Sequence, residues 1–259
     1  MANVRQLFDL TGRVAIVTGG SIGLGRQMAE ALAEMGVSVV LSARKKERCE
    51  EAARELRQLG VRTLAVGCNV SDPHDVQKMV QSTLDEFGAI DILVNSAGTS
   101  WASPAEEMTL VNWQKVIDTN LTGTFLCCQA VGKVMIGQQR GRIINVASIG
   151  AYGGSPQELM ATPGYTASKG AVITLTKDLA CEWAGHNVQV NAIAPGFFPT
   201  HMSGGLIEMK REVMLRDIPM RRFGGDDELK GAVVYLASQA SSYVTGHVLV
   251  VDGGQTAQV

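Results

Sequence analysis

The chain has 259 residues, of which 46% are hydrophobic and 19% charged, so it can bury one large core and is not mainly disordered. A protein that follows a nucleic-acid backbone is normally more basic than this chain, whose formal net charge is −2, and no apolar run reaches the roughly 18 residues of a membrane span. The 5 cysteines form no C-x-x-C pair, the 4 histidines have no metal-ligand spacing, and the N-terminus lacks a signal-peptide core, so we expect a cytoplasmic protein without a metal.

Short runs rich in β-branched residues alternate with longer amphipathic segments along the chain. We predict strands over residues 13–17, 38–42, 63–66, 91–94, 142–146, 188–193 and 248–251. We predict helices over 24–36, 45–60, 71–88, 109–136, 164–184 and 226–237, with an irregular Met-rich stretch over 197–222. Because strands that alternate with helices form right-handed crossovers, the sequence predicts one doubly wound, Rossmann-type α/β domain over 1–259, with a seven-stranded parallel sheet flanked by helices.

Small, polar and glycine residues follow the predicted strands, at Thr18–Gly25, Arg44–Lys46, Asn69, Asn95–Gly98, Ala147–Ser148 and Pro195–Gly196. The carboxyl ends of parallel strands share one edge of the sheet, where open α/β sheets bind their ligands. The sequence therefore predicts a binding site at this edge.

The first of these segments joins a strand to a helix and contains Gly19, Gly23 and Gly25. Glycines let the backbone approach a pyrophosphate, and the helix N-terminus offers N–H donors. A tight turn without a ligand is the alternative interpretation. The segment also matches the G-x-S-x-G nucleophile elbow of hydrolases, with Ser21 as nucleophile, a hypothesis that requires an acid and a histidine later in the chain.

Three cations, Arg44, Lys45 and Lys46, follow the second predicted strand. An acidic residue at this place would bind the ribose hydroxyls of NAD, whereas cations at a helix start oppose the helix dipole. A bound 2′-phosphate would remove that conflict, and a solvated charged face is the alternative. We therefore favour NADP(H) over NAD(H), with Arg44 as the main contact and Lys45 as a second one.

Tyr165 and Lys169 lie one helical turn apart, so both project from one face of a helix. A free tyrosine titrates near pH ~10, and we expect the Lys169 ammonium to lower the pKa of Tyr165. Ser148 follows the fifth predicted strand and could hydrogen-bond a substrate oxygen that Tyr165 protonates. The alternative for Tyr165 and Lys169 is an exposed pair of side chains on one helix, and the alternative for Ser148 is a serine that caps a helix or turn.

At this point the chain resembles the short-chain dehydrogenases/reductases over almost its whole length. The resemblance rests on the glycine segment Thr18–Gly25, on Asn95-Ser-Ala-Gly98, on Asn120, Ser148, Tyr165 and Lys169, on Pro195–Thr200, and on Asp252-Gly-Gly254. Two departures stand out: Asn69 replaces the family's usual aspartate, and the segment between Ser148 and Tyr165 is longer than usual.

The resemblance implies hydride transfer between NADP(H) and a ketone or secondary alcohol. It makes Tyr165 the acid or base, Lys169 its partner and a ribose ligand, Ser148 the carbonyl ligand, and Asn120 the holder of a water that relays protons to Lys169. The implied cofactor contacts are Gly19, Ser21, Ile22, Gly23, Gly25, Arg44, Lys45, Asn69, Val70, Asn95, Ala97, Gly98, Tyr165, Lys169, Pro195, Gly196, Phe198 and Thr200. A catalytically inactive nucleotide-binding relative is the competing hypothesis.

The position of the stretch 197–222, after the Pro195–Gly196 segment, predicts a lid over the substrate. Trp101, Tyr152 and His201 are candidates to face the pocket. The chain resembles family members that act on a sugar acid, such as gluconate 5-dehydrogenase, and others that act on 3-oxoacyl groups, while apolar lid residues favour an acyl or cyclic ketone. The resemblance also implies a homotetramer, with a small-molecule substrate and no nucleic-acid or membrane partner.

Overall fold

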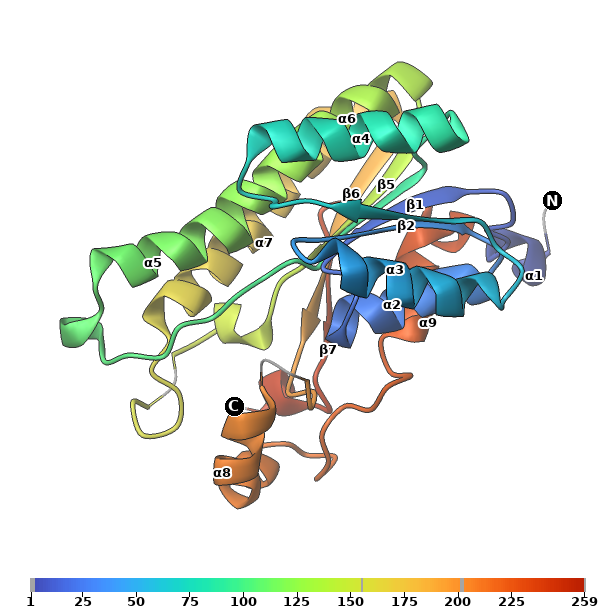
Figure 1. Ribbon diagram of the computed structural model, residues 1–259. Helices are drawn as coiled ribbons and strands as arrows, with labels where there is room; N and C mark the ends of the chain where they lie inside the picture. Colours follow the sequence, from blue (N-terminus) through green and yellow to red (C-terminus); the bar gives the residue numbers. More distant parts are fainter. Residues whose placement is uncertain (1–2, 155, 201–202, 259) are drawn as a thin grey trace.

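The structure, a computed structural model, describes residues 3–154, 156–200 and 203–258. Seven parallel strands form one sheet in the order β3-β2-β1-β4-β5-β6-β7 (Figure 1). They are β1 (Val14–Thr18), β2 (Ser38–Ala43), β3 (Thr63–Gly67), β4 (Ile92–Asn95), β5 (Gly141–Val146), β6 (Val188–Pro195) and β7 (Val248–Val251). The predicted Rossmann-type domain with a seven-stranded parallel sheet is thus confirmed.

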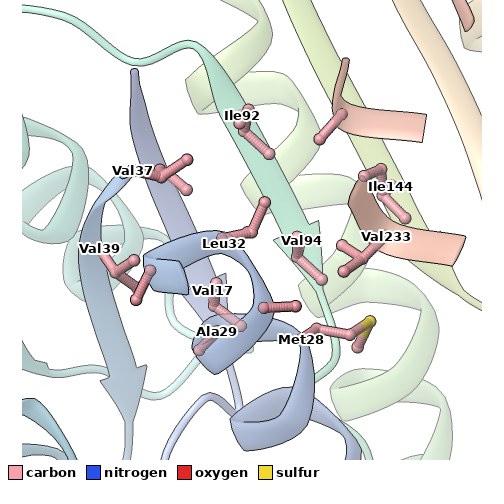
Figure 2. Packing of buried hydrophobic residues seen from close by; sticks show 14 of the residues in the cluster. Val17, Met28, Ala29, Leu32, Val37, Val39, Ile92, Val94, Ile144 and Val233 are labelled. Carbon is pink, nitrogen blue, oxygen red and sulfur yellow. The ribbon is translucent and has the colours of Figure 1, made fainter. Parts of the chain in front are cut away.

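Helices cover both faces of the sheet (Figure 1). Buried side chains on one face come from α2 (Gly23–Glu34), α3 (Lys46–Arg57) and α9 (Lys230–Ala237). Those on the other face come from α4 (Pro73–Phe87), α6 (Gly123–Gln138) and α7 (Pro163–Trp183). Figure 2 shows the first core, where Met28, Ala29 and Leu32 of α2 pack over Val17 and Val94 of the central strands. None of the described helices has the length and apolarity that crossing a membrane requires.

The strand order reverses between β1 and β4. The chain runs outward from β1 through β2 to β3 and then returns, so that β4 pairs with the free side of β1. The register places Thr18 beside Ser42 on one side and beside Asn95 on the other. Such a reversal separates the loops that follow the two central strands and creates a ligand-binding crevice at their carboxyl ends.

The structure corrects several predicted boundaries. The stretch predicted to be irregular contains the helix α8 (Gly204–Arg216), and a short α1 (Val4–Leu7) precedes the first strand. Among the described side chains of α8, Ile207 and Met214 are buried and lie two helical turns apart, a pattern too sparse to indicate a helix. α9 begins at Lys230, four residues later than the prediction, since the preceding residues form turns.

The long helix predicted over 109–136 is interrupted. α5 (Leu110–Ile117) and α6 are joined by a π-helical segment, η2 (Asp118–Thr122). Such wide turns are rare in helices and are frequent at functional sites. Here the π-helical turn contains Asn120, whose side chain is fully buried.

A buried carboxylate joins three strands at the amino edge of the sheet, opposite the crevice. Oδ1 of Asp91 accepts from Nη1 of Arg13 at 3.1 Å and from Nε of Arg140 at 3.0 Å. Its Oδ2 accepts from the backbone N–H of Val14 at 3.0 Å. These contacts connect the starts of β1, β4 and β5, while both arginines remain partly exposed and therefore partly screened by solvent.

We predict that Asp91→Ala destabilises the fold by about 2–3 kcal/mol, since it leaves a buried N–H and two guanidinium groups without their acceptor. Urea unfolding would measure the loss. The activity of the folded variant should be unchanged, because Asp91 lies at the edge away from the cavity. A destabilisation below about 0.5 kcal/mol, the usual range of surface substitutions, would contradict the assigned role.

Candidate active site

A cavity of about 1500 Å³ opens at the carboxyl edge of the sheet. Its walls come from the segments that follow β1, β2, β3, β4, β5 and β6, together with α8 and the residues after β7. The cavity is therefore the crevice that the strand order predicts. Of the proposed cofactor contacts it is lined by Gly19, Ser21, Ile22, Gly23, Gly25, Arg44, Lys45, Asn69, Val70, Ala97, Gly98, Tyr165, Lys169, Pro195, Gly196, Phe198 and Thr200.

The glycine segment lines the cavity, and two of its positions have no room for a side chain. Gly19 has a positive φ of +67°, and a Cβ atom on it would lie 2.9 Å from the backbone N of Ala97. A Cβ atom on Gly25 would collide with the carbonyl oxygen of Gly19. Ile22, the N-cap of α2, makes no side-chain capping bond, so the free N–H groups of the first helical turn can serve an anion.

Thr18 holds the loop after β4 against the glycine segment. Its Oγ1 accepts from the backbone N–H groups of Ser96 and Ala97, both at 3.2 Å. Asn95 itself lies behind the cavity wall, where its Nδ2 donates to Oδ1 of Asn145 at 2.9 Å. The structure therefore gives Asn95 a buried supporting position, while Ala97 and Gly98 of the same motif line the cavity.

Positive charge gathers at the end of the cavity beside β2. Arg44 and Lys45 line this region, as predicted from their position after the strand. Arg48 lies in the first turn of α3 and also lines the cavity, although its position does not stand out in the sequence. The available signal was its place in the first turn of the helix that follows Arg44–Lys46.

Tyr165, Lys169 and Ser148 meet in the central wall. Ser148 lies next to Tyr165, and its Oγ accepts from the backbone N–H of Gly150 at 3.1 Å. The Nζ of Lys169 donates to the carbonyl oxygen of Val146 at 2.6 Å and lies 5.7 Å from the centre of the Tyr165 ring. The helix spacing and the end of β5 thus bring together residues that are separated in the sequence.

The titration behaviour of this group corrects the prediction. Burial raises the pKa of Tyr165 above its ordinary value, and the hydrogen bond with Ser148 offsets part of that rise. Loss of solvent lowers the pKa of Lys169 to about 8. The expected lowering of the Tyr165 pKa by Lys169 is therefore wrong: burial is the largest cause of the shift, and the group that lowers the pKa is Ser148.

Asn120 fastens the elements around Lys169. Its Oδ1 accepts from the N–H of Thr99 at 2.8 Å, and its Nδ2 donates to Oγ of Ser168 at 3.0 Å. A Cβ atom on Gly98 would lie 3.4 Å from this Oδ1 and 3.8 Å from Nζ of Lys169, which shows how closely these groups approach. The side chain of Asn120 therefore joins the loop after β4 to α7 and does not line the cavity itself.

Of the three residues expected to face the pocket, one lines the cavity. Tyr152 lines the cavity and is half exposed. Trp101 is not among the lining residues, although Ser100 and Ala102 are, and Nζ of Lys115 lies 5.5 Å from the centre of its ring. His201 lies outside the described residues. Sequence reasoning missed Thr162, Lys210 and Gln255, all of which line the cavity.

The hydrolase hypothesis lacks its base. Ser21 lines the cavity, but no histidine is present among the lining residues within the described parts of the chain. A serine nucleophile needs a base within hydrogen-bond reach. Ser21 is therefore left with its place in the glycine segment, next to the Cys49 thiol.

Comparison with known proteins gives a consistent result. Residues 19–256 match the protein family described as enoyl-(acyl carrier protein) reductase. The chain is 41% identical over 247 residues to a 3-oxoacyl-[acyl-carrier-protein] reductase of Synechocystis sp., covering 95% of this chain and 97% of the relative. It is 39% identical over 256 residues to gluconate 5-dehydrogenase of Gluconobacter oxydans, covering 97% of each.

Solved structures agree with the fold. A short-chain type dehydrogenase/reductase from Mycobacterium marinum is 38% identical, with a TM-score of 0.95 over 99% of this chain and 100% of that one. A gluconate 5-dehydrogenase from Burkholderia cenocepacia, in complex with NADP and tartrate, is 35% identical, with a TM-score of 0.94 over 99% of this chain and 100% of that one.

Lys169 should make stability depend on pH. Because its pKa falls from 10.5 in the unfolded chain to about 8 in the folded one, the unfolded state binds more protons between these values. Folding stability contributed by this group therefore rises with pH across that window. We expect the difference in unfolding free energy between the wild type and Lys169→Met to grow in favour of the wild type from pH 7 to 10. Denaturant titrations at several pH values would measure it, and a flat difference would show an ordinary, solvated ammonium.

Proposed function

The chain belongs to the short-chain dehydrogenase/reductase family, and on that premise we propose that it is an NADP(H)-dependent oxidoreductase that interconverts a ketone and a secondary alcohol. The observation that carries the proposal is that Tyr165, Ser148 and the buried Lys169 lie together in the wall of the cavity. Nicotinamide, when bound, supplies or accepts the hydride.

The shape of the cavity fits a dinucleotide. The cradle formed by Gly19 and Gly25 would be filled by any Cβ atom, and the uncapped start of α2 offers donors to a pyrophosphate. Arg44, Lys45 and Arg48 stand where the adenosine 2′-phosphate would lie, and no described acid lines the cavity beside them. The relative from Burkholderia cenocepacia is in complex with NADP, which supports the same cofactor here.

The proton step belongs to Tyr165. Its raised pKa keeps the phenol protonated at neutral pH, so it can donate to the oxygen of a ketone that is being reduced. Ser148 lies within hydrogen-bond reach of Tyr165 and can orient the same oxygen. The positive charge of Lys169 stabilises the phenolate left after the transfer. Asn120, which holds the loop after β4 and α7, acts as a positioning residue in this scheme.

We propose that the stretch 197–222 is a lid over the substrate. Ser203, Met209 and Lys210, in or next to α8, line the cavity. The substrate is either a sugar acid or a 3-oxoacyl or cyclic ketone, since the relatives include a gluconate 5-dehydrogenase and a 3-oxoacyl-[acyl-carrier-protein] reductase. The relative in complex with NADP and tartrate has a hydroxylated acid bound.

We propose that the chain forms a homotetramer. Apolar side chains of α5 and α6 are exposed, among them Leu110, Val111 and Phe125. Adjacent exposed apolar side chains of this size often mark contacts between subunits.

Substitution of Tyr165 tests the proton step. Tyr165→Phe removes only the hydroxyl, so we expect kcat to fall by roughly 100-fold or more, while the Kd for NADPH changes little. NADPH oxidation and a fluorescence titration would measure the two quantities, with the fully exposed Tyr243→Phe as the control. Retained turnover would reject the acid–base role. Tight NADPH binding without turnover of any ketone by the wild type would favour the inactive nucleotide-binding relative.

Substitution of Arg44 tests the cofactor preference. Arg44→Asp replaces a phosphate ligand by a repelling carboxylate that can bind ribose hydroxyls, so we expect kcat/KM for NADPH to fall at least about tenfold relative to that for NADH. Arg54→Asp, in α3 and outside the cavity lining, is the control. An unchanged NADPH to NADH ratio would show that Arg44 does not contact the phosphate.

A further inference from the structure

A group of hydrogen-bonded polar side chains lies inside the largely apolar core between the sheet and α7. Asn95 and Asn145 stand directly opposite each other on β4 and β5, where Nδ2 of Asn95 donates to Oδ1 of Asn145 at 2.9 Å. Nδ2 of Asn145 donates in turn to Oγ1 of Thr176 in α7 at 3.0 Å, and this hydroxyl donates to the carbonyl oxygen of Val172 at 2.7 Å. Asn145 and Thr176 are fully buried. The amide of Asn145 therefore bonds one neighbouring element through its oxygen and another through its nitrogen.

A thiol on α6 is the fourth member of this group. Sγ of Cys128 accepts from Nδ2 of Asn95 at 3.2 Å and donates to Oδ1 of Asn145 at 3.5 Å. Burial raises the pKa of this thiol to about 12, so it keeps its proton at neutral pH. The four side chains therefore link β4, β5, α6 and α7 through neutral hydrogen bonds.

Packing alone does not account for polar side chains at these positions. Val172, Leu179 and Ala180, which are also buried in α7, are apolar. Apolar side chains of similar volume in place of Asn145 and Thr176 would fill the same space without the cost of removing polar groups from water. A buried hydrogen-bond network, in contrast, fixes one arrangement of the elements that it joins. The network therefore determines how these four elements meet.

The ammonium of Lys169 lies where three of these elements come together. It projects from α7 and donates to the carbonyl oxygen of Val146, the last residue of β5, at 2.6 Å. A Cβ atom on Gly98, in the loop after β4, would lie 3.8 Å from the same Nζ. Thr176 follows Lys169 by about two helical turns, so both side chains project from one face of α7. Asn145 therefore bonds the same three elements, β4, β5 and α7, that surround the ammonium.

We propose that Asn145 is a positioning residue for Lys169. Its bonds to Asn95 and Thr176 hold the ends of β4 and β5 against α7, and this keeps the ammonium beside the Tyr165 ring during the proton transfer. The proposal rests on the oxidoreductase function proposed above and adds to it a residue that does not line the cavity. A displacement of about 1 Å in a group that supports the reaction can lower the rate by roughly 100-fold, so a network behind the site can control turnover.

Thr176→Val tests this role, because it keeps the shape of the side chain and removes the oxygen to which Asn145 donates. We expect kcat for ketone reduction to fall roughly tenfold. The Kd for NADPH should change less than about twofold, since the glycine segment and the cations beside β2 are unchanged. The solvent deuterium isotope effect on kcat should rise, because the proton transfer becomes slow relative to the other steps. Thr176→Ser should restore kcat.

Thr83→Val is the matched control. Thr83 is fully buried in α4 and, like Thr176, donates to the carbonyl oxygen four residues earlier, at 2.8 Å. None of the hydrogen bonds between described residues joins its hydroxyl to another side chain. Only Thr176→Val should lower kcat, whichever of the two variants has the lower Tm. An equal loss of kcat in both variants, or a wild-type kcat and isotope effect in Thr176→Val well below its Tm, would overturn the positioning role.

The double variant Asn145→Leu/Thr176→Val serves if the single variant does not fold. Replacing both partners of a buried hydrogen bond by apolar groups of similar shape can leave stability nearly unchanged. We expect this variant to fold and to show the same loss of kcat. Folding with a wild-type kcat would show that the network supports only the fold, and would overturn the proposal.

The choice of ketone keeps the two proposals separate. The wild type is first assayed for NADPH oxidation with 5-oxo-D-gluconate, cyclohexanone and acetoacetyl-N-acetylcysteamine, and the ketone with the highest kcat is used for the variants. No oxidation of NADPH by the wild type with any of the three would reject the proposed function, and the positioning role with it. Turnover by the wild type with an equal kcat in the variants would overturn the positioning role and leave the proposed function standing.

Discussion

The site of this protein depends on the close approach of two loops, the one after β1 and the one after β4. The backbone of Gly19 lies so near that of Ala97 that a side chain would not fit, and Thr18 accepts two N–H groups from the loop opposite. This contact is possible because β4 returns to the free side of β1. It closes the end of the crevice where the backbone can meet a phosphate, and it sets the position of Gly98, beside Asn120 and Lys169.

The second constraint is the burial of a charge. Lys169 lies almost wholly away from solvent, bound to the carbonyl oxygen of Val146 at the end of β5. Burial lowers the pKa of Lys169 to about 8 and raises that of Tyr165, so the pKa values of the two groups move apart. Side chains with shifted pKa values in a cleft are candidates for a functional site. In the proposed reduction the phenol of Tyr165 starts protonated, and the Nζ of Lys169 lies 5.7 Å from the centre of its ring.

The amino and carboxyl edges of the sheet have different roles. At the amino edge, the carboxylate of Asp91 accepts hydrogen bonds from Arg13, Arg140 and a backbone N–H, and these bonds hold the strands together. At the carboxyl edge, the segments that follow the strands carry small and polar residues and line the cavity. The ion pairs of the amino edge hold strands together, whereas the hollow at the carboxyl ends of the strands leaves room for a ligand.

The sequence by itself determined the sheet, the glycine loop, the cations after β2, and the pairing of Tyr165 with Lys169 on one helix face. All of these follow from local periodicity or from short spacings, which act within a few residues. Only the tertiary structure decided the direction of the Tyr165 pKa shift, the supporting position of Asn95, and the helix in the stretch predicted to be irregular. It also revealed that Thr162 does not cap its helix and that Gln255 reaches the same cavity. Burial and the choice of hydrogen-bond partner depend on contacts between distant parts of the chain, and no local pattern of residues contains them.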